Sequence, residues 1–237
     1  MNRYLKIYFL TLALAGAALS GCKTSSTCCN ESDANWTVLF DGKSNAALIG
    51  YKTDHFPSEA WKIDGGTLKT LTAAEGGKHI DIMTREKFTD FEFVCEWKVS
   101  PGGNSGIIYK VTETGPASHS TGFECQVLDD AVHADGKKPL TSAGALYALI
   151  APNASKKLMP VGEWNEARIV VKGTHGEHWL NGKKVVEYEQ GSAALKDLIA
   201  KSKFAKLPTF GTITEGHLCL QNHGQEVWFR NLKIRRL

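Results

Sequence analysis

Short runs of alternating apolar and polar residues, separated by turn residues, are the feature that most limits what this chain can fold into. The run FEFVCEWKV (91–99) alternates almost throughout, and the pattern returns in TGFECQVLDD (121–130), EARIVVKGTHGEHWLNGKKVVEYE (166–189) and GHLCLQNHGQEVWFRNLKIRRL (216–237). Successive side chains of a strand point to opposite faces, so these runs predict half-buried strands. Only SAALKDLIAKSKF (192–204) has helical composition and spacing, and it predicts one short amphipathic helix.

Turn residues divide the strands at close intervals. The D-G pair in WKIDGGTLKT (61–70) predicts a hairpin, PGGNSG (101–106) predicts a turn before the strand IIYKV, and NHGQ (222–225) predicts a closing hairpin. The glycine-containing turns within 166–189 predict three consecutive strands there. Many short antiparallel strands joined in this way predict an all-β fold, a β-sandwich or jelly roll of two antiparallel sheets.

The N-terminus predicts export. A basic start, MNRYLK, precedes an apolar run that is too short for a comfortable membrane span, and the run ends in LSGC (19–22), which resembles a bacterial lipobox. We therefore expect a signal peptide at 1–21, lipid on Cys22, a polar tether at 22–34 and a folded domain at 35–237. The alternative is an ordinary secretory signal with a chance cysteine. Lys23 is not the aspartate associated with inner-membrane retention, so we expect a lipid-anchored envelope protein of the outer membrane, facing the periplasm.

Charge and cysteine content argue against nucleic-acid binding and against a structural zinc site. The formal charge of +3 falls to about +1 because Arg3 and Lys6 leave with the signal, and no basic run remains to bind nucleic acid. No C-x-x-C pair occurs, which argues against a structural zinc site. Disulfides and buried free thiols both stay open for Cys95 and Cys125, whereas Cys219 should face away from them and stay unpaired.

The outward residues of the predicted strands suggest a carbohydrate site. If Phe123, Cys125 and Val127 face the core, Glu124 and Gln126 share the opposite face, about 6–7 Å apart. The same alternation turns four groups of side chains outward: Gln221 and His223, Cys219, Glu96 and Lys98, and Trp228 and Arg230. Planar polar groups with an aromatic neighbour suit sugar hydroxyls and C–H surfaces. Ordinary solvated side chains are the alternative for each of them.

Seven motifs along the chain together resemble one known family. They are WTVLFDGKS, GGNSGIIYK, GFECQVLDD, GALYALIAP, PVGEWNEARIVVKG, WLNGKKVVEYE and LQNHGQEVWFRNLKIRRL, in order from Trp36 to Leu237. This set resembles the bacterial 3-keto-disaccharide hydrolase family. The resemblance implies a concanavalin A-like jelly roll, a catalytic domain that acts on glycosides oxidised to a ketone at C3, and a groove around Glu124 and Gln126.

A 3-keto sugar can be cleaved by elimination, because its ketone acidifies the C2 hydrogen. The hypothesis assigns Glu124 as base, Arg230 or Lys110 near the enolate, and His223 as proton donor to the leaving oxygen. A bound divalent metal ion is a further option beside the enolate, and the sequence indicates no particular cofactor. The remaining substrate-binding candidates are Gln126, Gln221, Asn104, Glu96 and Trp228.

Two other functions stay open. One is a non-catalytic carbohydrate-binding module on the same fold. The other is a conventional glycosidase, since laminarinases of this fold carry E-x-D-x-x-E where this chain has Glu124-x-Gln126-x-x-Asp129. Gln126 cannot ionise, and a double displacement needs two carboxyl groups about 5–5.5 Å apart. Glu96 on another strand would have to supply the second one.

Overall fold

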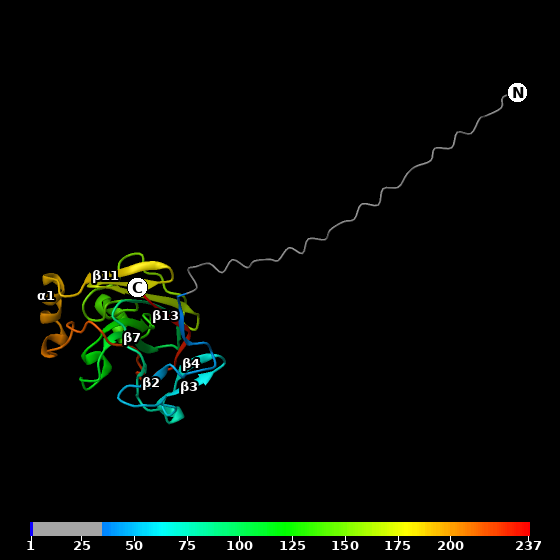
Figure 1. Cartoon of the computed structure of the whole chain (residues 1–237), viewed down its shortest axis with the longest axis horizontal. Helices are drawn as coiled ribbons and strands as arrows, with labels where there is room; N and C mark the ends of the chain where they lie inside the picture. Colours follow the sequence, from blue (N-terminus) through cyan, green and yellow to red (C-terminus); the bar gives the residue numbers. More distant parts are fainter. Residues whose placement is uncertain (2–34) are drawn as a thin grey trace, which may run out of the picture. The chain divides into compact units, whose positions relative to one another are not determined.

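The computed structural model describes Met1 and residues 35–237 (Figure 1). The predicted signal peptide, the lipid-attachment residue Cys22 and the tether with Cys28 and Cys29 lie outside the described residues. Asn35–Leu237 forms one unit by its internal contacts. Among the described residues, no helix combines the length and apolar character needed to cross a bilayer.

Two antiparallel sheets face each other, which confirms the predicted jelly-roll sandwich. Sheet A has the order β11-β10-β9-β6-β13-β4-β3, with β1 also paired to β13, and sheet B has the order β2-β5-β12-β7-β8. The strands of sheet A are β1 (Thr37–Phe40), β3 (Trp61–Asp64), β4 (Thr67–Thr70), β6 (Phe91–Val99), β9 (Asn165–Lys172), β10 (His175–Leu180), β11 (Lys183–Glu189) and β13 (Val227–Arg236). Those of sheet B are β2 (Leu48–Gly50), β5 (Ile82–Thr84), β7 (Asn104–Val111), β8 (Phe123–Leu128) and β12 (His217–Leu220).

The hydrophobic core lies between the sheets and follows the predicted alternation. Phe123 and Val127 of sheet B and Phe229 of sheet A are at most 1% exposed and belong to one apolar cluster. Burying an aromatic or large aliphatic side chain of this kind contributes roughly 1.5–3 kcal/mol. The inward side of each strand is therefore set by its apolar residues.

Most of the predicted connections are present. The 61–70 hairpin pairs β3 with β4, and residues 165–189 form the three strands β9, β10 and β11. The predicted helix is α1 (Ala193–Lys201), the one α-helix in residues 35–237, followed by a 3-10 turn, η5 (Lys203–Lys206). Ser192 caps α1 by accepting a hydrogen bond from the Leu195 amide at 3.2 Å. In Figure 1, α1 lies on the opposite side of this domain from β3 and β4.

The prediction of a closing hairpin around residues 222–225 is wrong. Strand β12 pairs with β5 and β7 in sheet B, whereas β13 pairs with β6, β4 and β1 in sheet A. Residues 221–226 therefore cross from one sheet to the other instead of turning back within one. Gly224 adopts a φ of +86° in this crossing, a conformation that glycine reaches without strain.

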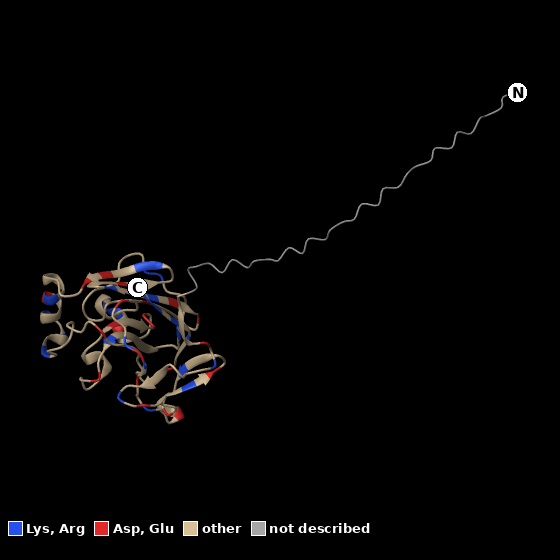
Figure 2. Cartoon of the chain, viewed as in Figure 1, with Lys and Arg blue, Asp and Glu red and all other residues tan. Residues whose placement is uncertain are grey.

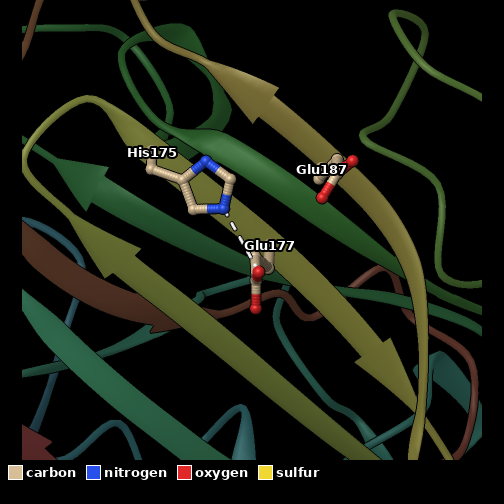
Figure 3. Close-up of side chains that lie close together, drawn as sticks. All are labelled: His175, Glu177 and Glu187. Carbon is tan, nitrogen blue, oxygen red and sulfur yellow. Dashed lines mark hydrogen bonds and ion pairs between the residues drawn. The ribbon is translucent and has the colours of Figure 1, made fainter.

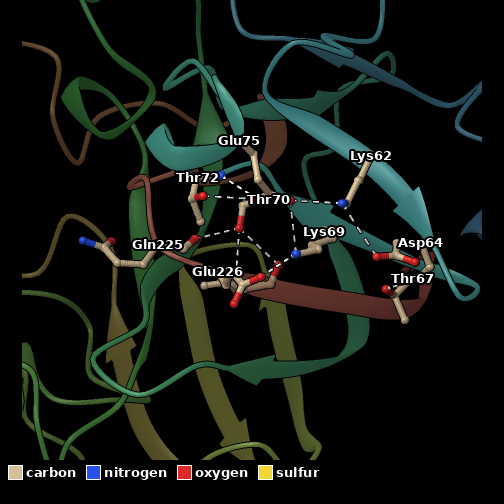
Figure 4. A network of polar contacts seen from close by, with 10 residues as sticks. Lys62, Asp64, Thr67, Lys69, Thr70, Thr72, Glu75, Gln225 and Glu226 are labelled. Carbon is tan, nitrogen blue, oxygen red and sulfur yellow. Dashed lines mark hydrogen bonds and ion pairs between the residues drawn. The ribbon is translucent and has the colours of Figure 1, made fainter.

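The outer face of sheet A carries a network of ion pairs. Glu92 forms ion pairs with both Arg168 and Arg235. Lys69 similarly pairs with Glu75 and Glu226 (Figure 4). Figure 2 shows basic and acidic residues interspersed over the strands. Because these charges pair with one another, we interpret this face as a structural surface and not as a ligand-binding one.

The cysteines that the structure describes are all free thiols. Cys95 and Cys125 lie in the main core, and burial raises the pKa of both thiols. Cys219 faces the other way and is unpaired, as predicted. It is nevertheless buried, because it packs with Met83, Ile108 and Val111 in a second apolar cluster. The outer face of sheet B is thus covered at this end and is not a uniformly polar surface.

Candidate active site

The outer face of sheet B carries a polar floor built from three neighbouring segments. Strand β8 contributes Glu124 and Gln126, β7 contributes Asn104, and the residue after β12 contributes Gln221. Gly106 of β7 lies opposite Gln126, and its carbonyl accepts a hydrogen bond from the Gln221 amide at 2.9 Å. The alternation therefore predicted correctly that these side chains would meet.

This floor belongs to a pocket of about 150 Å³, here called the inner pocket. The floor residues are largely buried, whereas the histidine and lysine side chains at the rim are exposed. The lining residues are Asn104, His119, Glu124, Gln126, Asp135, Tyr147, Lys203, Gln221 and His223. A buried acidic and amide floor under a basic rim can bind a small polyol and exchange protons with it.

A second pocket of about 250 Å³, here called the outer pocket, adjoins the inner one. The two share His119, Gln221 and His223. The outer pocket adds His79, Asp81, Ala117 and Asn222. The two pockets are therefore neighbours, separated by a wall of three shared polar residues.

Glu124 supplies the one carboxyl group of the floor, and its surroundings perturb that group. Its side chain is buried, and within residues 35–237 no side-chain or backbone donor forms a hydrogen bond to its carboxyl group. Burial raises its pKa from 4.5 to about 8, although the nearby Lys203 charge acts in the opposite direction. Glu124 is therefore mostly neutral at pH 7, and it becomes a base on the alkaline side of neutrality.

Gly106 makes room for the Glu124 carboxyl group. A Cβ atom at position 106 would lie 2.2 Å from Glu124 Oε1 and 2.8 Å from its carboxyl carbon. No side chain can occupy that space without moving Glu124. The glycine at this position therefore allows the carboxyl group to lie across β7.

The side-chain oxygen of Gln126 is free to accept a hydrogen bond from a ligand. It is 2% exposed, and its Nε2 donates to the Thr141 carbonyl at 3.3 Å. Its Oε1 is buried and has no partner among the described residues. A buried acceptor left unpaired costs about 1–3 kcal/mol. A ligand hydroxyl that donates to this oxygen would recover that free energy.

The structure brings five predicted residues together in the inner pocket: Asn104, Glu124, Gln126, Gln221 and His223. Arg230, Glu96 and Trp228 lie instead on the outer face of sheet A, where Arg230 Nη2 donates to Glu96 Oε2 at 2.6 Å. The expectation that they share a face with Glu124 is wrong, because a two-sheet sandwich has two opposite outer faces.

Lys110 is also absent from both pockets. It is 3% exposed and has a φ of +58°, and its Nζ donates to Gln190 Oε1 at 2.5 Å. The pairing of β7 with β12 shifts register at this point, which turns the Lys110 side chain away from the floor. The prediction that Lys110 lies beside a bound sugar is therefore wrong.

Four pocket residues escaped prediction: His119, Asp135, Tyr147 and Lys203. Tyr147 lies in the GALYALIAP motif, and its amide donates to the Glu124 carbonyl at 3.0 Å. Its hydroxyl donates to Asp135 Oδ2 at 3.1 Å, and Lys203 Nζ lies 4.2 Å from the centre of its ring. His119, Asp135 and Lys203 lie in the short 3-10 turns η2 (Ser118–Ser120), η3 (Ala134–Lys137) and η5. Such turns have no periodicity that would have marked them.

Asp129, which ends the E-x-Q-x-x-D run, has a structural role. Its carboxylate accepts hydrogen bonds from the amides of Gly102, Ala131 and Val132 at 2.8–3.3 Å. It lines neither the inner nor the outer pocket. Strand β8 therefore supplies one carboxyl group to the floor, and Gln126 occupies the place of a second.

The two pockets contain donor atoms that suit a divalent metal ion, from His79, Asp81, His119, His223 and Glu124. The one cluster in residues 35–237 whose ligand atoms lie within 4.8 Å of one another is elsewhere, at His175, Glu177 and Glu187 on sheet A (Figure 3). Lys184 already forms ion pairs with both of these glutamates. This cluster has the contacts of a surface ion-pair network.

Known proteins resemble this chain over nearly all of its described length. Residues 35–235 match the family described as the 3-keto-alpha-glucoside-1,2-lyase-like domain. A 3-keto-disaccharide hydrolase of Bacteroides thetaiotaomicron is 35% identical over 232 residues, which cover 85% of this chain and 78% of that protein.

Solved structures also resemble this chain. A crystal structure of a Parabacteroides distasonis protein, named as a candidate glycosyl hydrolase, has a TM-score of 0.76 and 32% identity, covering 86% of this chain and 94% of that one. A carbohydrate-binding module from Bacillus subtilis has a TM-score of 0.50 and 10% identity, covering 80% of this chain and 95% of that one. The second likeness shows a shared fold alone.

Proposed function

Because the chain belongs to the 3-keto-alpha-glucoside-1,2-lyase-like family, we propose that it cleaves the glycosidic bond of 3-keto-glycosides. The relative from Bacteroides thetaiotaomicron is named for hydrolysis of 3-keto-disaccharides and supports this substrate class. The reaction proposed is elimination across C1 and C2 followed by addition of water. The net result of the two steps is hydrolysis of the glycosidic bond.

The elimination needs a base, a positive group and an acid. The base removes the C2 hydrogen, and the electron pair of that C–H bond forms an enolate with the C3 ketone. The enolate then reforms the ketone while a C1–C2 double bond forms and the C1–O bond breaks. The leaving oxygen takes a proton from the acid. Water finally adds to C1, and C2 regains a proton, so that no oxidant or reductant is consumed.

The inner pocket offers a residue for each role. Glu124 is the proposed base, since it is the buried carboxyl group of the floor. Lys203 replaces Arg230 and Lys110 as the proposed cation near the enolate, because its ammonium group lines the same pocket. His223 stays the proposed acid, with His119 beside it on the shared wall.

One observation carries the proposal: the largely buried carboxyl group of Glu124, whose pKa burial raises, lies on the same pocket floor as the unpaired oxygen of Gln126. A module that only binds sugar gains nothing from a desolvated carboxyl group, whose burial is costly. Such a module would also be expected to present aromatic platforms, whereas Tyr147 is the one aromatic residue besides histidine in the inner pocket. These features favour catalysis over simple binding.

A conventional double displacement is less well supported. Gln126 replaces the second carboxylate of the strand motif, Asp129 is held by three backbone amides, and Glu96 lies on the other sheet. An elimination needs one strong base from this strand and no second carboxylate there. This arrangement supports the elimination.

The test compares matched glucosides with and without the 3-keto group, in deuterated water. We expect cleavage of the keto substrate only, with exchange or a primary isotope effect at C2–H, and a loss of roughly 10²–10⁴-fold in kcat for Glu124→Gln. Glu96→Gln is the matched control, because it removes a carboxylate from the other sheet. Comparable cleavage of the unoxidised glucoside, without involvement of C2–H, would return the assignment to an ordinary glycosidase.

We also propose that the protein is anchored in the cell envelope by lipid on Cys22. The proposal rests on the LSGC sequence and the polar tether that follows it. The carbohydrate substrate would then be met at the membrane surface, on its periplasmic side.

A further inference from the structure

The inner pocket has room for one sugar ring. Its volume of about 150 Å³ lies well below the roughly 300–1,000 Å³ of pockets that enclose drug-sized ligands. Its floor and walls present hydrogen-bonding groups from Asn104, Gln126, Asp135 and Tyr147. A single polyhydroxylated ring fits these dimensions and this chemistry, and a second linked ring would extend beyond the inner pocket.

The position of Glu124 determines which ring that is. Glu124 lines the inner pocket and not the outer one. If it takes the C2 proton, as proposed above, the keto sugar occupies the inner pocket. The C1–O bond is one bond away from C2, so the leaving oxygen lies beside the groups at the pocket's edge.

The edge toward the outer pocket is the wall formed by His119, Gln221 and His223. The two histidines are exposed, so their rings can reach a bound ligand from the rim. A group attached to the leaving oxygen that passes this wall enters the outer pocket. The outer pocket is thus the adjoining space on the side of the proposed acid.

The outer pocket is equipped to bind hydroxyl groups. Asp81 Oδ1 accepts from the Asn222 amide at 2.8 Å, and its Oδ2 accepts from Ser118 Oγ at 2.5 Å. Each carboxylate oxygen can accept a further hydrogen bond. His79 packs against Gly224, where a Cβ atom would lie 2.4 Å from its Nε2, and its exposed ring borders the same pocket.

We propose that the outer pocket binds the leaving group, and that this group is a second sugar or a comparable polyol recognised by His79 and Asp81. This inference rests on the proposed function and deepens it. The substrate then has its keto sugar at the non-reducing end, with a single ring in the inner pocket. Internal residues of a polysaccharide do not fit, because the keto sugar would need a further ring on its other side.

The test uses two substrates with the same keto sugar and anomeric configuration: a methyl 3-keto-glucoside and a 3-keto-disaccharide. We expect His79→Ala to raise KM for the disaccharide about tenfold and to change KM for the methyl glycoside less than about twofold. Asp81→Asn should show the same pattern, since the amide keeps the shape and its oxygen can still accept from Asn222. His175→Ala on sheet A is the matched control and should change neither KM.

The outcomes separate this inference from the proposed function. If both substrates are cleaved and the two variants raise KM equally for both, or for neither, the leaving-group assignment is overturned while the function stands. If the unmodified protein cleaves neither substrate, the function and the assignment fall together. A KM increase confined to the disaccharide in His79→Ala supports the assignment even if Asp81→Asn does not fold.

Discussion

The buried carboxyl group of Glu124 should make the stability of this protein depend on pH in a way that Glu124→Gln removes. Burial raises the pKa of Glu124 from 4.5 to about 8. Because the folded-state pKa lies above the unfolded-state value, the stability contributed by neutral Glu124 is fully present below pH 4.5 and is lost as the pH rises through 8. At about 1.4 kcal/mol per pKa unit, the loss is at most about 5 kcal/mol.

The assay is urea unfolding of the wild type and Glu124→Gln at pH 5 and pH 9. Other titrating groups are common to both proteins and cancel in the difference. We expect the free energy of unfolding of the wild type, relative to Glu124→Gln, to decrease by about 2–5 kcal/mol between the two pH values. The same pKa predicts that the rate of C2–H exchange with solvent, which needs the ionised base but not the acid, rises about tenfold per pH unit up to pH 8.

Two results would refute this reasoning. Parallel pH–stability curves for the wild type and Glu124→Gln would show that the carboxyl group is not desolvated in the folded protein. A C2–H exchange rate that falls as the pH rises through 8 would show that the protonated form of Glu124 is the active one, so that Glu124 acts as an acid. Glu96→Gln, on the outer face of sheet A, provides the control for removal of a partly exposed carboxylate that is paired with Arg230.

Four further substitutions test the site and its surroundings. Gly106→Ala should lower kcat about 10²-fold by displacing the Glu124 carboxyl group, with the β-rich circular dichroism spectrum retained as a check on folding. Gln126→Ala should raise KM more than it lowers kcat, and the opposite split would assign Gln126 a role in the chemical step. Arg230→Gln should leave kcat/KM unchanged and cost under about 1 kcal/mol in urea unfolding, since its partner carboxylate is partly solvated. Cys22→Ser should release the protein from the membrane fraction without changing its melting temperature, and retention there would contradict the lipid anchor.

The order of turns and the alternation of side chains were sufficient to predict the sandwich and the facing of individual strands. Phe123 and Val127 point inward and Glu124 and Gln126 outward, because burying the apolar side of each strand is favourable in any sandwich. The ordered motifs of the chain likewise indicated the family without structural information. These features are local, and each can be read within one strand or one turn.

Which sheet each strand joins is not local, and only the tertiary structure decided it. The sequence predicts that Gln221 and Arg230 both face outward, yet residues 221–226 cross between the sheets and place the two on opposite outer faces. Alternation has a period of two along one strand and says nothing about which of the two outer faces a residue reaches. That choice depends on hydrogen bonding with strands far away in the chain.

The rim of the site also depended on tertiary structure. His119, Asp135 and Lys203 come from three separate 3-10 turns, and Tyr147 comes from a segment that runs beside β8. The pKa of Glu124 is raised chiefly by burial in the folded protein, and Lys203 of one of these turns acts in the opposite direction. The sequence by itself determined which side chains the sheet could offer to solvent. The packing of distant loops over sheet B determined which of them became a pocket, because desolvation depends on what covers a group in three dimensions.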